Sequence, residues 1–208
     1  MKVYLVANPK GGSGKSTLAT NLAGLLAHKG SKNGSTRVML GDVDRQQSSR
    51  FWLQRRPAGL PPITNWEVTP GKAAKPPSGT THVVLDSPAG LHDAKLSDLL
   101  KMTHKVLVPI QPSMFDILAT QDFFAELAEL KAVRGLDVGL VGMRVDDRTR
   151  SAEQFYRFIE STGLPLISCL RSTQNYVQLA AYGLTIFDVA PSRVEKDRMQ
   201  WEPIEKWV

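Results

Sequence analysis

Ten residues near the start of the sequence, Asn8 to Thr17, have the residue types of a phosphate-binding loop. They read NPKGGSGKST, three glycines followed by a lysine, a serine and a threonine. Glycines let backbone N–H groups turn toward phosphate oxygens, and a helix that begins at the loop adds partial positive charge. Such a loop binds a nucleoside triphosphate with Mg²⁺. The predicted cradle comprises Lys10, Gly11, Gly12, Ser13, Gly14, Lys15, Ser16 and Thr17.

Three side chains of this loop have distinct expected tasks. The Lys15 ammonium should reach the β- and γ-phosphates, the Ser16 hydroxyl should bind Mg²⁺, and Thr17 should contact the α-phosphate. The usual pattern, G-x-x-x-x-G-K-[ST], would have glycine where this sequence has Pro9, followed by an additional lysine, Lys10. The missing glycine is tolerable as long as residues 10–14 keep the wrap around the phosphates. We therefore expect ATP and Mg²⁺ as cofactors.

The elements around the loop alternate between apolar runs and helix-like stretches. A single domain over residues 1–208 is expected, an α/β P-loop NTPase with a mostly parallel twisted sheet covered by helices on both faces. The expected strands lie in residues 2–8, 37–44, 81–90, 104–113, 137–145 and 164–170, and the expected helices in 16–30, 91–102, 115–133, 151–161 and 173–183.

Two polar or Pro/Gly-rich segments interrupt this alternation. Gly30 is the expected C-cap of the first helix, which makes SKNGS, residues 31–35, a polar turn. Residues 55–79 are rich in Pro and Gly, and we expect one short strand around Trp66–Val68 followed by a mobile loop.

Carboxylates at the ends of two expected strands complete the predicted site. Asp86 closes an apolar strand and should hold Mg²⁺ directly or through water. Asp44 is a candidate for orienting the attacking water, and Asp42 for the metal shell, for assisting Asp44, or for a strand-end cap. The residues alone do not rank Asp42 and Asp44. Arg144 and Pro191 follow late strands, where a base pocket would lie, and are candidate adenine contacts.

Several motifs together resemble the ParA/MinD family of ATPases. KGGSGKST resembles the family's deviant Walker A motif, and the compact length resembles its small partition members. The similarity continues through VMLGDVDRQQSS, HVVLDSPAG, VLVPIQPSMFDI and LISCLRSTQNYVQLAAYGLTIFDVAPSR. One departure is Arg45, which stands where the family has proline.

The resemblance implies a mechanism in which two protomers enclose two ATP molecules. Lys10 would then reach the partner's nucleotide and act with Lys15 in catalysis, and Asp44 rather than Asp42 would orient water. It further implies a homodimer on ATP binding, nonspecific DNA binding, and a stimulating adaptor on a cargo such as a plasmid, a chromosome region or a carboxysome. The DNA-binding residues implied by family position are Arg148, Arg150, Arg171, Arg193, Lys196 and Arg198.

Charge and composition constrain the partners and the compartment. The net charge is +6, which favours a polyanion partner. Residues 1–80 hold twelve Lys/Arg against three Asp/Glu, whereas residues 144–208 hold nine of each. The basic excess thus precedes the implied DNA-binding residues, which makes Arg50, Arg55 and Arg56 further candidates for that surface. The single Cys169 and the absence of a signal peptide and of a long apolar span indicate a cytoplasmic protein. Association with the nucleoid is implied only by the family resemblance.

Two alternative functions remain open at this stage. A MinD-like regulator would bind membrane through its C-terminal segment, but Pro203 interrupts the apolar residues there and Glu202 and Glu205 intrude. We expect instead a helix packed on the sheet. A metabolic P-loop enzyme, such as a kinase or a nitrogenase-type reductase, is less compatible with Lys10 and with a single cysteine.

Overall fold

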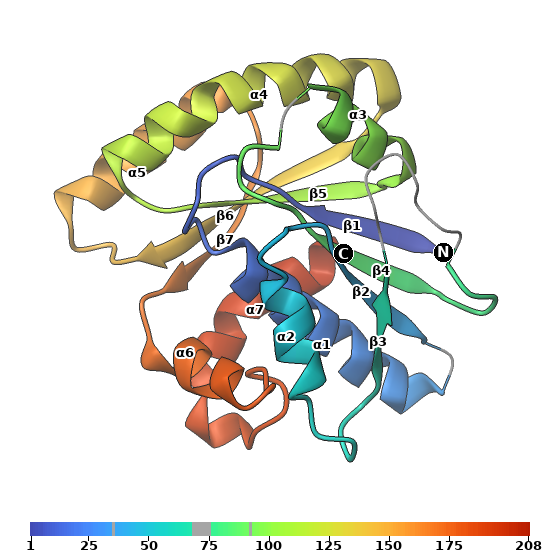
Figure 1. Ribbon diagram of the computed structural model, residues 1–208. Coiled ribbons are helices and arrows are strands. Elements are labelled where there is room, and N and C mark those ends of the chain that lie inside the picture. The colour runs from blue at the N-terminus through green and yellow to red at the C-terminus, as the bar shows by residue number, and fades with distance from the viewer. Residues whose placement is uncertain (35, 68–75, 92) are drawn as a thin grey trace.

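The structure, a computed structural model, is a single seven-stranded parallel sheet between two layers of helices (Figure 1). It describes residues 1–34, 36–67, 76–91 and 93–208. The strand order is β3-β2-β4-β1-β5-β6-β7, and every neighbouring pair is parallel. This confirms the predicted fold class. The strands are β1 Lys2–Val6, β2 Val38–Asp42, β3 Ile63–Trp66, β4 His82–Asp86, β5 Lys105–Ile110, β6 Asp137–Val145 and β7 Leu166–Arg171.

The helices divide between the two faces of the sheet. Because side chains alternate along a strand, Val3 and Leu5 pack in one cluster and Tyr4 and Val6 in the other. The first face is covered by α3 Asp93–Met102, α4 Met114–Arg134 and α5 Arg150–Thr162. The second is covered by α1 Lys15–Asn33, α2 Ser48–Gln54, α6 Gln174–Ala181 and α7 Glu195–Trp207, with a short 3₁₀ helix, η1 Pro191–Arg193.

The register of the central strands brings the predicted acids to the loop. Asp86 at the end of β4 lies opposite Val6 of β1 on one side and opposite Asp42 of β2 on the other. All three strands end at the same edge because they are parallel. The loop between β1 and α1 begins at this edge, so the sequence-distant acids and the glycine-rich loop meet there.

The first helix is longer than predicted. Gly30 lies inside α1, and the C-cap is Gly34, which has the left-handed φ of 66° and donates its N–H to the Gly30 carbonyl. The predicted C-cap at Gly30 was therefore wrong, and residues 31–33 of the predicted polar turn are helical. A Cβ on residue 30 would lie 2.2 Å from the Cβ of Thr36, so this glycine serves the close return of the chain.

The third strand also differs from its prediction. It spans Ile63–Trp66 and pairs with β2, so it begins before the predicted Trp66–Val68 segment. Ile63 and Trp66 are buried, and this anchors the strand at the sheet edge. Val68 and the predicted mobile loop that follows lie largely outside the described residues.

The C-terminal segment is a helix packed on the sheet, as predicted. α7 continues past Pro203, and Trp201 and Ile204 are almost completely buried. The Trp201 ring meets Phe187 edge-on, and its Nε1–H donates to the Tyr176 hydroxyl at 3.0 Å. The apolar side of this helix is thus used in the core.

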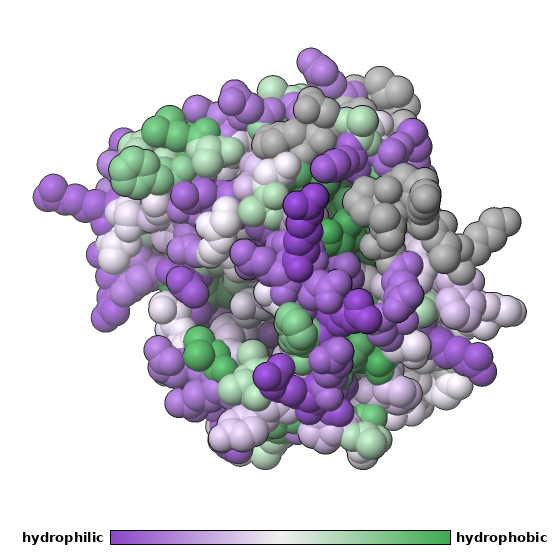
Figure 2. All heavy atoms as spheres, viewed as in Figure 1, coloured by the Kyte–Doolittle hydropathy of each residue, from purple (hydrophilic) through white to green (hydrophobic). Residues whose placement is uncertain are grey.

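The surface carries one apolar patch near the loop edge. Met114, Phe115 and Leu118, in the first turns of α4, are more than half exposed. In Figure 2 this patch appears as green spheres at the upper left, over the beginning of α4. Among the described helices, none has the length and hydropathy required to cross a bilayer.

Candidate functional site

The glycine-rich loop has the backbone conformation of a phosphate cradle. Gly12 and Gly14 have φ values of 80° and 99°, in the left-handed region that glycine adopts without strain. No described atom lies within 4 Å of a Cβ built on Gly11 or Gly12, which leaves open space on that side of the loop. α1 begins at Lys15, directly after Gly14 and one residue before the predicted start at residue 16. N–H groups and a helix N-terminus therefore converge on the space where phosphates would bind.

Hydrogen bonds to two other segments, residues 109–111 and Gly90, hold the loop in this shape. The buried Asn8 donates from Nδ2 to the Pro109 carbonyl and accepts the Lys10 N–H, both at 2.8 Å. Gln111 Nε2 donates to the Gly12 carbonyl at 2.5 Å. The Gly90 N–H donates to the Pro9 carbonyl at 2.8 Å. Pro9 is not among the residues with a positive φ, so its backbone conformation does not require glycine.

Lys15 is buried near Asp86 and Asp44, and its ammonium donates a hydrogen bond to a backbone carbonyl. Its Nζ donates to the Lys10 carbonyl at 2.9 Å. Burial lowers the pKa of Lys15, and the nearby charges of Asp86 and Asp44 oppose that change. A triphosphate in the cradle would bring negative charge next to this ammonium, which favours its protonated form.

Asp86 has the surroundings expected of a metal ligand. Its side chain is buried, its Oδ2 accepts a hydrogen bond from Ser49 Oγ, and its Oδ1 has no partner among the described residues. Burial raises its pKa from 3.8 to about 7, against the lowering effect of the Ser49 and Ser16 hydroxyls. Buried polar atoms without partners are rare in folded proteins, and here Ser13 Oγ and Ser87 Oγ share that condition.

The oxygens at this site suit a Mg²⁺ ion that is bound partly by the protein and partly by phosphate and water. The described residues contain no group of three His, Cys, Asp or Glu side chains that could hold a metal ion. Mg²⁺ typically binds one or two protein oxygens and completes its shell with waters and phosphate oxygens. Asp86 Oδ1 and the Ser16 hydroxyl are suited to that role.

The two acids after β2 have different surroundings. Asp42 accepts three backbone N–H groups: Oδ1 from Asp44 at 3.0 Å, and Oδ2 from Ser49 at 2.8 Å and Arg50 at 3.1 Å. It therefore shapes the turn after β2 and satisfies two N–H groups in the first turn of α2. Asp44 is half-buried, and its charge is close enough to affect the pKa of Lys15. Among the described residues, its carboxylate accepts one hydrogen bond, from the Gln46 N–H at 3.0 Å. Asp44 is thus the more available of the two for water.

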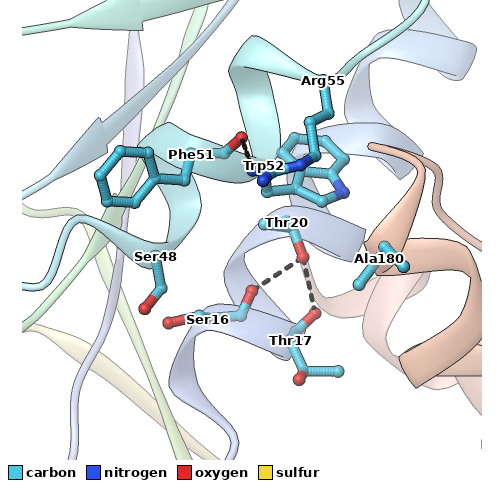
Figure 3. A pocket seen from close by; sticks show the side chains of 9 residues that line it. Ser16, Thr17, Thr20, Ser48, Phe51, Trp52, Arg55 and Ala180 are labelled. Atoms are coloured by element: carbon cyan, nitrogen blue, oxygen red, sulfur yellow. Dashed lines mark hydrogen bonds between the residues drawn. The ribbon is translucent and has the colours of Figure 1, made fainter.

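A cavity of about 410 Å³ opens beside the loop, between α1, α2 and α6 (Figure 3). Ser16 and Thr17 form one end, and the aromatic rings of Phe51 and Trp52 line the α2 wall. Neither of the predicted adenine contacts lines it. Arg144 is exposed on a left-handed backbone (φ 56°) where the β6–β7 pairing is irregular, and Pro191 begins η1.

Residue 144 nevertheless follows a direct contact with the loop. A Cβ on Gly14 would lie 2.8 Å from the end of the Met143 side chain. The end of β6 therefore approaches the start of α1, which is compatible with a base contact from Arg144. The adenine contacts remain predictions.

The six predicted DNA-binding residues do not have equal surroundings. Arg148 forms a two-point contact with Asp146, and Arg171 Nε donates to the buried Asp197 at 2.6 Å, so both are partly neutralised. Arg198 lies over the Phe187 ring. The three that are exposed without a described carboxylate partner are Arg150, Arg193 and Lys196.

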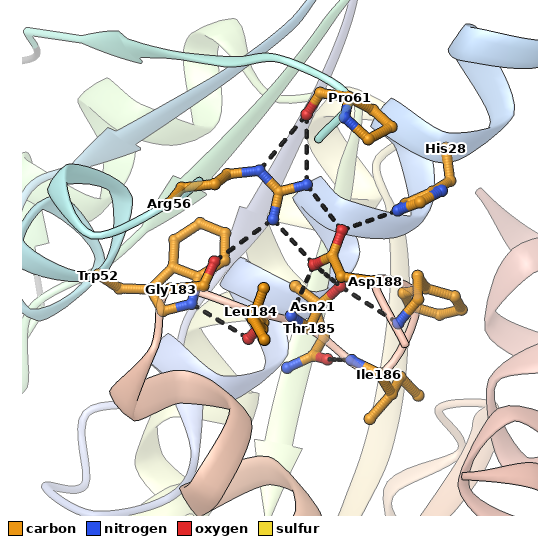
Figure 4. A network of polar contacts seen from close by, with 11 residues as sticks. Asn21, His28, Trp52, Arg56, Pro61, Gly183, Leu184, Thr185, Ile186 and Asp188 are labelled. Atoms are coloured by element: carbon orange, nitrogen blue, oxygen red, sulfur yellow. Dashed lines mark hydrogen bonds and ion pairs between the residues drawn. The ribbon is translucent and has the colours of Figure 1, made fainter. Parts of the chain in front are cut away.

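Sequence reasoning missed Ser49 and a buried charge network. Ser49 links the ends of β2 and β4, because its N–H donates to Asp42 and its hydroxyl to Asp86. In the network, Arg56 contacts both carboxylate oxygens of Asp188, at 2.8 and 2.9 Å (Figure 4). Ser49 follows a recognised acidic motif, which was a usable signal, whereas Arg56 had only been counted as a surface cation.

The fold and the loop together define a P-loop nucleotide-binding domain of the α/β class. A sequence profile of the CobQ/CobB/MinD/ParA nucleotide-binding domain matches residues 4–186. The chain belongs to this family, which confirms the resemblance drawn from its motifs and assigns it to a family that includes ATPases.

Individual proteins within and around this family are similar to most of the chain. Maintenance of carboxysome distribution protein A from Gloeobacter kilaueensis is 31% identical over 189 residues, covering 89% of this chain and 83% of the relative. The protein of the same name from Halothiobacillus neapolitanus is 28% identical over 193 residues, covering 88% and 86%. The fold is similar to that of a Cyanothece McdA in complex with ATP, with a TM-score of 0.76, 16% identity and coverage of 99% and 96%.

Proposed function

We propose that this protein is a cytoplasmic, nucleoid-associated ATPase that dimerises on ATP binding and positions an intracellular cargo. Hydrolysis of ATP with Mg²⁺ is slow until a cargo-bound adaptor stimulates it. The relatives that carry a carboxysome-distribution name support a protein body as the cargo. A plasmid or chromosome region remains the alternative cargo within the same mechanism.

Lys10 is the residue whose surroundings carry this proposal. Its backbone N–H is tied to Asn8, yet its ammonium has no hydrogen-bond or ion-pair partner among the described residues. Lys15 already occupies the inside of the loop. A second cation at the loop edge is suited to a nucleotide on a facing protomer, where it would stabilise charge between the β- and γ-phosphates.

The apolar patch on α4 supports a dimer at the same edge. The patch of Met114, Phe115 and Leu118 follows β5 directly, and Gln111 in the intervening turn contacts the cradle. Exposed apolar patches frequently mark protein contacts. A facing protomer would cover this patch and the loop together.

In the proposed site, Asp86 and the Ser16 hydroxyl hold Mg²⁺, which would neutralise phosphate charge. Lys15 binds the β- and γ-phosphates, and Asp44 orients the attacking water. The dimer then binds nonspecific DNA through the exposed cations Arg150, Arg193 and Lys196. That binding should weaken steeply with salt because phosphate contacts release counterions.

Molar mass in solution tests the proposal. Light scattering should show a dimer with ATP and Mg²⁺ and a monomer with ADP, and Lys10→Ala should remain monomeric while still binding ATP. Lys2→Ala is the matched control, since Lys2 lies at the opposite end of β1 and bonds to the Val208 carbonyl. A Lys10→Ala protein that dimerises normally would remove the role proposed for this cation. A gel-shift assay with ATP, ADP and no nucleotide would test DNA binding separately.

A further inference from the structure

Ser49 occupies a buried position between the two strand-end acids. It is the second residue of α2, is completely buried, and uses both of its donors on carboxylates. Its N–H donates to Asp42 Oδ2 at 2.8 Å and its hydroxyl donates to Asp86 Oδ2. A helix-capping contact explains the first bond, but the second bond joins α2 to a different strand.

We propose that Ser49 is a positioning residue that orients the Asp86 carboxylate for Mg²⁺. By holding Oδ2, the hydroxyl fixes the rotation of the carboxylate and leaves Oδ1, the oxygen without a described partner, for the ion. Hydrogen bonds to a ligating carboxylate orient it, and their removal commonly costs metal affinity. This inference rests on the proposed function, since it takes Asp86 to be the Mg²⁺ ligand.

The expected effect is specific to the metal. Ser49→Ala should raise the Mg²⁺ concentration that half-saturates nucleotide binding by about 10–100-fold, the usual result of losing a second-sphere partner. Nucleotide affinity in EDTA should stay unchanged, because the cradle and Lys15 are untouched. A residue that mattered only for folding would lower both affinities together.

The experiment titrates a fluorescent ATP analogue in EDTA and then at increasing Mg²⁺. Ser48→Ala is the matched control, since its side chain is exposed one residue away and bonds to neither acid. Should Ser49→Ala not fold, Ser49→Cys replaces it, with a side chain that donates a much weaker hydrogen bond. A folded variant with wild-type Mg²⁺ dependence, or with equal losses in EDTA and in Mg²⁺, overturns the inference. Asp86→Ala separates the two levels: if it keeps wild-type Mg²⁺ dependence, the metal assignment itself fails.

A different set of contacts joins the other end of α2 to the segment before α7. Arg56, just after α2, contacts both oxygens of Asp188 and donates to the carbonyls of Pro61 and Gly183 (Figure 4). Trp52 Nε1 donates to the Leu184 carbonyl at 3.3 Å. We call Arg56, Asp188 and the Trp52–Leu184 bond the α2 brace.

Glycine is required where these two segments touch. Gly183 has a φ of 69°, and a Cβ there would lie 2.5 Å from backbone atoms of Arg55 and Arg56. The Arg56 and Asp188 side chains are almost fully buried, and Thr185 and His28 supply further donors to Asp188. Breaking such a network leaves a buried charge unpaired, so the two segments should move as one body.

The geometry points to a second role for α2, as the link between the nucleotide site and the segment η1–α7. Hydrogen bonds to Asp42 and Asp86 connect the beginning of α2 to the ends of β2 and β4. The α2 brace connects the end of α2 to the chain that leads into η1. Coupling requires an element with two discrete positions that both sites bias, and in this proposal α2 is that element. Nucleotide binding would thereby affect the position of the segment that carries Arg193 and Lys196.

Hydrogen exchange with and without ATP and Mg²⁺ tests this link without relying on DNA. In the wild type, ATP should change amide exchange in both α2 and η1–α7. In Arg56→Ala the change in α2 should persist while that in η1–α7 falls about fivefold or more, the lower range of typical coupling. Arg55→Ala is the matched control, since the partner of that exposed guanidinium among the described residues is the Phe51 carbonyl. If Arg56→Ala does not fold, Arg56→Lys, which lacks the planar fork, takes its place.

Two results overturn the link. In the first, ATP changes amide exchange in α2 of the wild type but not in η1–α7. In the second, a folded Arg56 variant shows the same ATP-dependent exchange changes as the wild type. Absence of ATP-dependent DNA binding in the wild type is a separate outcome. It would contradict the proposed function and leave the exchange result to decide the link.

Discussion

Replacing Asp86 with asparagine should make the nucleotide-free protein more stable at neutral pH. The side chain keeps nearly the same shape but can no longer ionise. In the folded protein burial raises the pKa of Asp86 from 3.8 to about 7, so the charged form is disfavoured there relative to the unfolded chain. Ionising a carboxylate in this position costs folding free energy unless a cation compensates for it.

The sign and the size follow from proton linkage. Below pH 4 the carboxyl group is protonated in both states and costs nothing. Between pH 4 and 7 the unfolded chain releases its proton first, so the free energy of unfolding of the wild type falls as pH rises. The full cost, present above pH 7, is about 4 kcal/mol at about 1.4 kcal/mol for each pH unit. Asp86→Asn lacks this loss.

Urea unfolding of both proteins at pH 4 and pH 8, in EDTA, measures the effect. The stability difference between Asp86→Asn and wild type should move in favour of the variant by several kcal/mol from the lower to the higher pH. Asp137→Asn is the control, because that side chain is 63% exposed and stays in water. A difference that is the same at both pH values would refute the reasoning about burial.

Other variants test separate parts of the site and the core. Lys15→Ala should abolish ATP binding measured by calorimetry, and retained affinity would contradict the assignment of the loop. Asp44→Ala should hold an ATP-bound dimer that does not release phosphate, whereas normal turnover would move the water-orienting role to Asp42. Asp42→Ala should destabilise the fold by about 0.5–2 kcal/mol in urea, as expected for loss of a helix cap. Trp201→Ala should cost about 3–5 kcal/mol by the same measurement, because a fully buried indole leaves a cavity; a loss below 1 kcal/mol would show that α7 is not part of the core.

Local patterns predicted the elements that depend on neighbours in sequence. The cradle of residues 10–17, the start of α1 to within one residue and the alternation of strands and helices all follow from residue type and spacing. The prediction that Gly30 ends the first helix failed because this glycine is needed for a tertiary contact and not for a helix cap. Thr36 returns so close to residue 30 that glycine is needed inside the helix, and the cap moved to Gly34.

Distant contacts decided the individual roles. Asp42 and Asp44 looked alike in sequence. Within the described part of the chain, however, three backbone N–H groups bind the Asp42 carboxylate and one binds the Asp44 carboxylate. Ser49 and Asp86 are 37 residues apart, and Arg56 and Asp188 are 132 apart. No spacing rule connects such pairs, because the sheet order brings them together.

The sequence by itself therefore determined the class of chemistry: glycines that free the backbone, a lysine and hydroxyls for a triphosphate, and apolar runs that must be buried. Tertiary structure decided which acid is buried and partly unpaired, which acid caps a helix, and which arginine is a structural ion pair. The physical reason is that a side chain's pKa, its partners and its exposure depend on everything that packs around it, and most of those neighbours are far away along the chain.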